Sequence, residues 1–231
     1  MSKRSAAAIA CFALAGLSSS GAAATVTTVD PGLYTGIDEV AEARVRLDGG
    51  NSQTWKLAFW DGAGSTPFMT NGNSDRDHFQ SSVTESFQLD YDVASGQLDW
   101  TVGTLTISDV VLLDPGHALA GLKYFVTSDR DPGETRAENM AVSLNGGAAV
   151  GIADATASFG TSFFEPANLF FDADVQTFRL SGDLTFAWNV GANLQGDRFR
   201  LSVKLNQGLI PAPGAVAAFG FVGLAATRRR R

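Results

Sequence analysis

The sequence predicts an all-β protein, specifically a two-sheet antiparallel β-sandwich or jelly roll. Apolar and polar residues alternate with a period of two along much of the 231-residue chain, as in half-buried strands. No stretch of the body keeps apolar residues at helical spacing for more than two turns. About ten to twelve expected strands lie near ten residues apart, a spacing typical of sandwiches and jelly rolls.

The first half of the body has the clearest alternation. Phe87, Leu89 and Tyr91 share one face of an expected strand, and the turn at residues 94–96 leads into a second strand. The two therefore predict a hairpin. The strands expected in this half cover residues 43–47, 54–60, 86–92, 97–102, 105–113 and 121–127.

The second half continues the same pattern. Asn145, Gly146 and Gly147 form a hairpin-type turn directly after an alternating run. Two longer polar segments, residues 63–78 and 128–138, are expected to be loops. The strands expected here cover residues 140–144, 150–153, 169–171, 176–180, 184–190 and 198–205.

The aromatic residues indicate where the core lies. All four tryptophans, Trp55, Trp60, Trp100 and Trp188, fall within expected strands, so most of them are expected to be core residues. Trp60 and Phe68 flank the long polar loop and are the candidates for exposed sugar-stacking rings.

The N-terminus has the pattern of a cleavable signal peptide. Lys3 and Arg4 precede an apolar run over residues 6–17, and Ala22 and Ala24 form an A-x-A cleavage site before Thr25. We therefore expect three parts: a signal peptide (1–24), an extracellular β-sandwich domain (25–208) and a C-terminal tail (209–231).

Cysteine and charge exclude several classes of function. The single cysteine, Cys11, lies in the expected signal peptide, so the mature chain would have no disulfide, thiol nucleophile or cysteine-ligated zinc. The body holds all 24 acidic residues but only 11 of the 17 Lys and Arg, a formal charge of about −13. This balance argues against nucleic-acid binding, which needs a basic surface.

The C-terminus has the pattern of a membrane-sorting tail. A short apolar run at residues 215–226 follows a proline-rich spacer and stops at four arginines, which would stay on the cytoplasmic side. The run is shorter than the ~20 residues that a membrane span needs, which favours a temporary anchor.

This tail resembles a PEP-CTERM sorting signal. The usual motif has Glu between its prolines, where this chain has Ala212. The resemblance implies processing by an exosortase-type enzyme in a bacterium that builds an exopolysaccharide matrix. It also implies transient anchoring in the inner membrane, followed by display at the cell surface or release. The residues that carry it are Ile210, Pro211, Ala212, Pro213, Arg228, Arg229, Arg230 and Arg231.

The body is similar to the choice-of-anchor class of bacterial extracellular domains. The residues that carry this likeness are 87–92, Ser95, Gly96 and 98–102, about a tenth of the body. The resemblance implies no catalytic residues.

Paired carboxylates are the first candidates for chemistry. Asp90 and Asp92 would share one face of a strand, and two carboxylates flanking a sugar bond are what a glycosidase needs. Since Phe87, Leu89 and Tyr91 would face the core, a solvated sheet face is the favoured interpretation of this pair. No serine lies in a G-x-S-x-G motif, so a serine hydrolase is not expected.

Calcium binding is a more plausible chemistry for this sequence than glycoside cleavage by paired carboxylates. Asn71, Asn73, Asp75 and Asp77 are spaced as alternating oxygen donors in a glycine-containing loop, and calcium prefers such ligands. The segment departs from an EF-hand because no distal Glu is suitably placed and no helices flank it.

The sequence therefore predicts an exported protein without catalytic activity. Its expected role is structural or adhesive within the extracellular matrix, with polysaccharide as a possible partner. A carbohydrate-binding module is the second hypothesis, and a glycan-cleaving enzyme with an Asp/Glu pair is the third.

Overall fold

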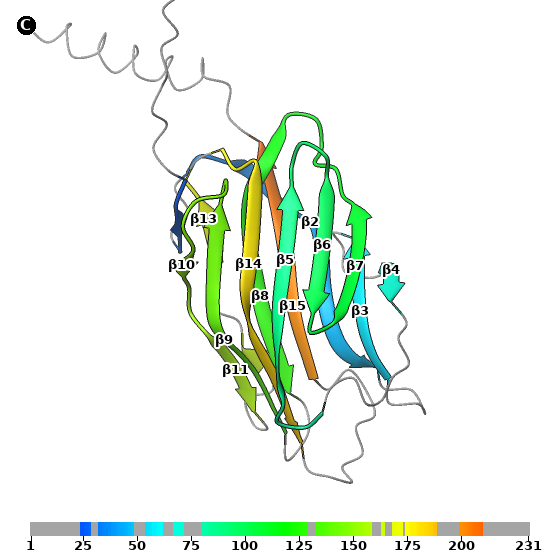
Figure 1. Cartoon of the computed structure of the whole chain (residues 1–231). Coiled ribbons are helices and arrows are strands. Elements are labelled where there is room, and N and C mark those ends of the chain that lie inside the picture. The colour runs from blue at the N-terminus through cyan, green and yellow to red at the C-terminus, as the bar shows by residue number, and fades with distance from the viewer. Residues whose placement is uncertain are drawn as a thin grey trace, which may run out of the picture.

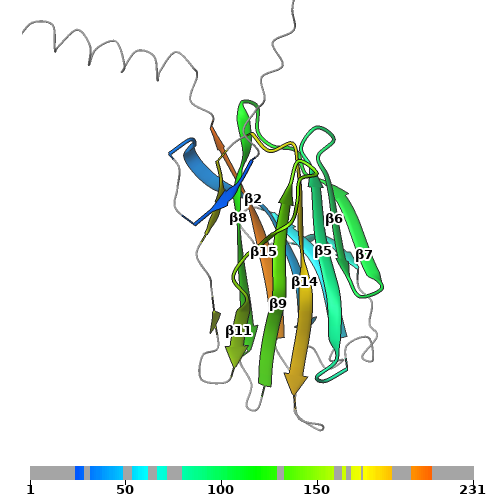
Figure 2. The same ribbon diagram turned by 60° about the vertical axis from the view of Figure 1, so that its left-hand side comes forward.

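The computed structural model is a sandwich of two antiparallel β-sheets (Figure 1). It describes residues 24–28, 32–48, 54–61, 67–71, 80–128, 133–158, 163–164, 168–172, 174–188 and 199–209. Within these residues every regular element is a strand, which confirms the expected all-β class and the two antiparallel sheets. Both views show the sheet of β9, β14, β5, β6 and β7 lying over the sheet of β8, β15, β2 and β3 (Figures 1 and 2).

The larger sheet has eight strands in the order β1-β13-β8-β15-β2-β3-β4, and β12 also pairs with β8. Its strands are β1 (Val26–Thr27), β2 (Thr35–Asp48), β3 (Thr54–Asp61), β4 (Pro67–Asn71), β8 (His117–Ser128), β12 (Phe163–Phe164), β13 (Leu169–Phe171) and β15 (Phe199–Leu209).

The smaller sheet has seven strands in the order β10-β9-β14-β5-β6-β7, and β11 also pairs with β9. Its strands are β5 (Thr84–Asp92), β6 (Gln97–Val102), β7 (Leu105–Val110), β9 (Gly133–Leu144), β10 (Val150–Gly151), β11 (Ala155–Ser158) and β14 (Thr177–Trp188).

The alternation of apolar and polar residues explains which face of each sheet packs against the other sheet. On β5 the residues Phe87, Leu89 and Tyr91 are buried, as the sequence predicts, and their neighbours face outward. The expected hairpin is confirmed, since Leu89 pairs with Trp100 of β6. Burying one face of each sheet removes apolar area from water, which is the main force holding the two layers together.

The core between the sheets is one contiguous cluster. Trp100 and Phe171 are among its largest side chains and have no exposed surface. Two buried tyrosines hydrogen-bond to connecting segments: Tyr91 donates to the Val111 carbonyl at 2.7 Å, and Tyr124 donates to the Ala153 carbonyl. Burial raises the pKa of both phenols to about 12, so both remain donors at neutral pH.

Two segments expected to be loops contain strand. Pro67–Asn71, inside the polar stretch 63–78, is the edge strand β4, which pairs with β3. Proline is tolerated at the first position of an edge strand because no neighbour needs its amide hydrogen. Likewise, β9 begins at Gly133 rather than at Met140. Its charged residues, such as Glu134 and Arg136, face outward, while Thr135 and Ala137 face inward. The high proportion of polar residues in this regular strand led to the incorrect prediction of a loop.

Several strand boundaries also differ from the expectation. The two strands expected at residues 176–180 and 184–190 form one strand, β14, and β2 begins at Thr35 rather than Ala43. The short strands β1, β11 and β12 were not expected. Each owes its conformation to pairing with a distant strand, because a run of two to four residues carries no periodicity of its own.

Candidate functional site

The outward side of the seven-stranded sheet is an array of hydrogen-bonding side chains. Alternation along four adjacent strands places these residues there, and we call the array the polar face. It consists of Gln97, Asp99 and Thr101 on β6, Ser86, Gln88, Asp90 and Asp92 on β5, Arg179, Ser181 and Asp183 on β14, and Glu134, Arg136, Glu138, Asn139 and Ser143 on β9.

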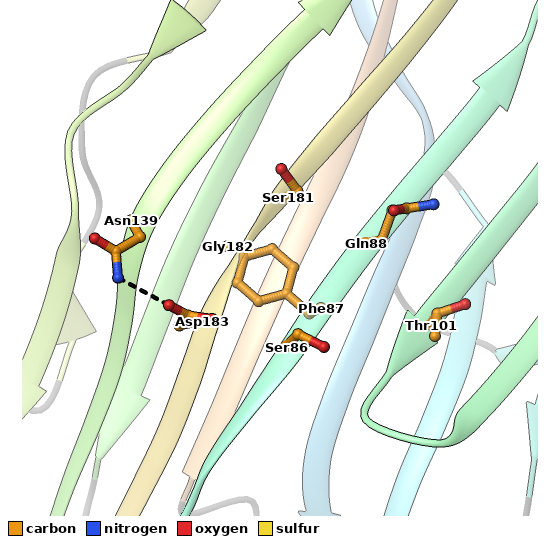
Figure 3. Close-up of a pocket in the computed structure, with 8 residues that line it drawn as sticks. All are labelled: Ser86, Phe87, Gln88, Thr101, Asn139, Ser181, Gly182 and Asp183. Atoms are coloured by element: carbon orange, nitrogen blue, oxygen red, sulfur yellow. Dashed lines mark hydrogen bonds between the residues drawn. The ribbon is translucent and has the colours of Figure 1, made fainter. Parts of the chain in front are cut away.

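A first hollow of about 400 Å³ lies over Gly182. Here two residues of β9, Asn139 and Met140, oppose the single Gly182 of β14, so the ladder contains a β-bulge. Because glycine has no side chain, the ring of Phe87 lies beneath this point; an added Cβ would come within 2.9 Å of it (Figure 3). The hollow thus has an aromatic floor and polar walls.

The bulge also orients one wall of the first hollow. Asn139 has a φ of 53°, in the left-handed region that asparagine tolerates better than most residues. In this conformation its Nδ2 donates to Asp183 Oδ2 at 2.8 Å (Figure 3). Bulges commonly reorient side chains beside binding sites, and this one joins the amide to a carboxylate.

A second hollow of about 610 Å³ continues along the same strands. Strand register places Asp99, Asp90 and Arg179 in one row across β6, β5 and β14. Arg179 Nε donates to Asp90 Oδ1 at 2.6 Å, and Gln97 Nε2 donates to Asp99 Oδ1 at 2.7 Å. Carboxylates directly opposite each other repel, so these donors stabilise the row.

Asp92 ends the row of polar residues on β5. Its Oδ1 accepts hydrogen bonds from the hydroxyl of Ser95 at 2.7 Å and from the Ser95 amide at 2.8 Å. These bonds, the hydroxyl contribution being the largest, hold the pKa of the Asp92 carboxyl below its usual value. Asp92 is therefore an ionised acceptor at the edge of the second hollow.

The structure agrees with the favoured interpretation of the carboxylate pair. Asp90 and Asp92 lie on the outward side of β5, opposite to the buried Phe87, Leu89 and Tyr91. The residue across the sheet from Asp90 on β6 is Asp99, a neighbour that the sequence spacing does not reveal.

The predicted calcium segment falls largely outside the described residues. Asn73, Asp75 and Asp77 are not described, and Asn71 is described only as the last residue of β4. Within the described ranges, no group of three or more His, Cys, Asp or Glu side chains is arranged to hold a metal ion.

The sugar-stacking candidates have a different outcome. The ring of Trp60 is only 3% exposed and so is not an open platform. This buried ring lies outside the cluster between the sheets and faces outward on β3, where the guanidinium carbon of Arg44 lies 4.3 Å from the ring centre. Of the other tryptophans, Trp100 is a core residue and Trp188 packs against the core as a half-buried residue. The side chains of Phe68 and Trp55 are outside the described part.

The predicted processing residues mostly lie outside the described residues. This applies to Ala22 and to the whole tail over residues 210–231. Ala24 is described as half-buried and packed on the core, and the adjacent Thr25 amide donates to Asp172 Oδ1 at 2.6 Å.

Sequence reasoning missed most of the polar face. Asn139 belongs to β9, whose first residues are expected from the sequence to be a loop. Arg179 and Asp183 belong to β14, which the sequence predicts as two separate strands. The Asn139–Asp183 and Asp90–Arg179 contacts join residues 44 and 89 positions apart. The alternation of Arg179 with the apolar Phe178 and Leu180 was the one local signal that this side chain faces outward.

No protein-family model and no curated protein sequence matches this chain. In the portion of the chain that the structure describes, no helix has the length and apolar character to cross a membrane.

Proposed function

We propose that this protein is exported, sorted by an exosortase-type enzyme, and retained in an exopolysaccharide matrix, where its role is adhesive. The export signal ending at Ala24 and the tail from Ile210 to Arg231 support the route. In this proposal the short tail anchors the chain in the inner membrane until it is cleaved, and the β-sandwich then acts outside.

The polar face is the observation that supports adhesion to polysaccharide. Its two hollows follow each other along β5 and β14, and the stretch from Ser86 to Asp92 is about 20 Å long. Sugars present hydroxyl groups that both donate and accept hydrogen bonds. The amides of Gln88 and Gln97 and the carboxylate of Asp99 offer matching partners in a fixed arrangement.

The geometry favours binding over cleavage. The hydrogen bonds from Ser95 lower the pKa of the Asp92 carboxyl, whereas a general acid that cleaves glycosidic bonds needs a raised one. Asp90 is already paired with Arg179. We therefore propose a role without catalysis.

A carbohydrate-binding module is the second candidate, and the same two hollows favour it. The two functions differ in their ligands: a module would bind defined glycans, whereas a matrix adhesin would bind the polymer of its own surroundings. A glycan array discriminates between them, since no binding across bacterial and plant polysaccharides would count against the module.

The test of the proposed site is a matched pair of substitutions. Asp99→Asn removes a charge in the second hollow, and Asp38→Asn makes the same chemical change at an exposed position of β2 on the other sheet. We expect Asp99→Asn to weaken binding of matrix polysaccharide about tenfold, as expected for losing a hydrogen bond to a charged group. Isothermal titration calorimetry measures the effect.

Asp38→Asn should bind like the unmodified protein. Equal affinity in the two variants would rule out the polar face as the binding site, and no binding of any matrix polysaccharide would refute the adhesive role.

A further inference from the structure

The outward side of the eight-stranded sheet carries basic residues. Strand register aligns Arg46 with Arg200, Arg44 with Ser202, and Lys204 with both Glu42 and Lys123. Because the core residues alternate with these positions, all of them face away from the core. We call the five cations Arg44, Arg46, Lys123, Arg200 and Lys204, on β2, β8 and β15, the cationic face.

Two aromatic rings fix four of these cations in place. Arg44 and Arg46 lie over Trp60, with guanidinium carbons 4.3 Å and 5.0 Å from the ring centre. Arg200 and Lys204 lie over Phe125 at 4.8 Å and 6.0 Å. A cation stacked on an aromatic ring loses less conformational freedom when it binds a ligand, because it is already positioned.

The two glutamates on this side of the sheet, Glu39 and Glu42, contact cations of the cationic face. Glu42 is fully buried, accepts hydrogen bonds from Arg44, including one from Nη2 at 2.6 Å, and lies 3.7 Å from Lys204. Lys204 Nζ also donates to Glu39 Oε2 at 2.6 Å. Burial raises the pKa of Glu39 against the opposing effect of Lys204. Among the described outward residues of this sheet, cations still outnumber carboxylates.

The opposite side of the sandwich has the reverse balance. On the polar face Arg179 and Arg136 are outnumbered by carboxylates, which include Asp90, Asp92 and Asp99. The chain as a whole has a formal charge of −7. The fold therefore segregates charge, since it gathers basic residues of an acidic protein on one side of one sheet.

We propose that the cationic face binds a polyanionic polysaccharide, one with carboxylate or sulfate groups repeated along its chain. This inference rests on the proposed matrix function and names a ligand class for a second surface. Guanidinium groups match carboxylate and sulfate oxygens in two-point hydrogen bonds. Successive outward residues on a strand lie about 7 Å apart and neighbouring strands about 4.8 Å apart, so the cations form a lattice that a repeating anionic polymer can follow.

Two hydroxyl groups among these cations support a ligand site. Ser202 has no exposed surface and Thr127 is 5% exposed, and both face outward between the basic residues. Neither Ser202 Oγ nor Thr127 Oγ1 has a hydrogen-bond partner among the residues that the structure describes. A buried unsatisfied hydroxyl is unfavourable, and an anionic oxygen that displaced the covering side chains would satisfy it.

The test measures the affinity of the full exported protein for polygalacturonate, with dextran as the uncharged polymer. We expect tight binding of polygalacturonate that weakens with added salt, and no comparable binding of dextran on this face. The double variant Arg46→Gln/Arg200→Gln should lose at least tenfold in affinity. Arg136→Gln, the same chemical change at an outward cation of β9 that lines neither hollow, should leave polygalacturonate affinity unchanged.

A thermal melt by circular dichroism checks that the double variant folds. Lys123→Gln, which removes the cation of β8, provides a second variant with the same expected direction. Unchanged polygalacturonate affinity in folded variants would overturn the inference, as would equal binding of dextran and polygalacturonate through these residues. Tighter binding of duplex DNA at equal charge concentration would assign the face to nucleic acid. Salt-sensitive dimers in sedimentation would assign it to the polar face of a second copy, and either result overturns the polysaccharide proposal.

The two proposals fail separately. If the unmodified protein does not bind polygalacturonate but still shows Asp99-dependent binding of matrix polysaccharide, the cationic site alone is refuted. If polygalacturonate binding depends on Arg46 and Arg200 while no binding depends on Asp99, the polar-face site alone is refuted.

Discussion

At the scale of single residues, close backbone approaches decide which positions admit only glycine. Gly121 of β8 pairs with Phe170 of β13, and a Cβ added there would lie 2.1 Å from the Leu169 carbonyl oxygen. Gly151 of β10 is less crowded, since its nearest atom would be 4.0 Å away. Both glycines lie in strands, so the two positions differ mainly in the space around them.

We therefore predict that Gly121→Ala destabilises the protein by about 1–3 kcal/mol, the usual cost of overpacking, because β13 must move away from β8. Gly151→Ala serves as the control and should change the free energy of unfolding by much less. Urea denaturation measures both. Equal midpoints for the two variants would contradict the close approach of the Leu169 carbonyl to Gly121.

At the scale of elements, an ionised side chain, Asp92, accepts hydrogen bonds from the turn between β5 and β6. Asp92 accepts both hydrogen bonds from Ser95 in the connecting turn, and its pKa is lowered as a result. A carboxyl group with a folded-state pKa below its unfolded value of about 3.9 stabilises the fold above that pH. This stabilisation is lost as the pH falls through the folded-state pKa.

The predicted consequence is a pH-dependent effect of Asp92→Ala. The variant should melt below the unmodified protein at pH 6, and the difference should shrink as the pH is lowered below about 4. Asp92→Asn keeps a hydrogen-bond acceptor without a titrating charge and isolates the charge contribution. Melting temperatures across this range provide the measurement. A difference that stayed constant from pH 6 to pH 2 would mean that the charge of Asp92 plays no part.

At the scale of the whole molecule, the two proposed processing sites flank the strands of the sandwich along the sequence. The first strand begins at Val26 and β15 ends at Leu209, so cleavage after Ala24 and beyond Ile210 would break no described strand pairing. Cleavage after Ala24 would remove one half-buried methyl group from the core. It would also turn the Thr25 nitrogen, which donates to Asp172, into a charged terminal amine and strengthen that contact.

We accordingly predict that the exported protein begins at Thr25 and lacks the residues from near Pro211 onward. Intact mass spectrometry of the protein recovered from outside the cell measures both ends together. A mass that still includes Arg231 would refute exosortase sorting, and a mass that includes residues 1–24 would refute the signal peptide. The control is the same protein recovered from cells without the exosortase-type enzyme, because only its C-terminal end should then differ from that of the processed protein.

The sequence alone predicted the fold class because period-two alternation and turn residues are local signals. The hairpin of β5 and β6 shows this, since apolar residues alternate on both strands and Ser95 and Gly96 mark the turn. The turn after Leu144 was equally readable: Asn145 and Gly146 both have the positive φ that such a turn requires. The pairing partners of each strand could not be predicted, because no local sequence pattern indicates that β14 lies between β5 and β9.

What only the tertiary structure decided is where side chains from distant strands meet. Total charge is a sum over the sequence and predicted an acidic body. The separation of that charge into a polar face and a cationic face depends on register between strands such as β2 and β15, more than 150 residues apart along the chain. The same holds for Asp90 and Arg179, and for the hollow above Gly182. Alternation fixes which side of its own strand a residue occupies, whereas its neighbours across the sheet follow from the packing of the whole core, which no local pattern encodes.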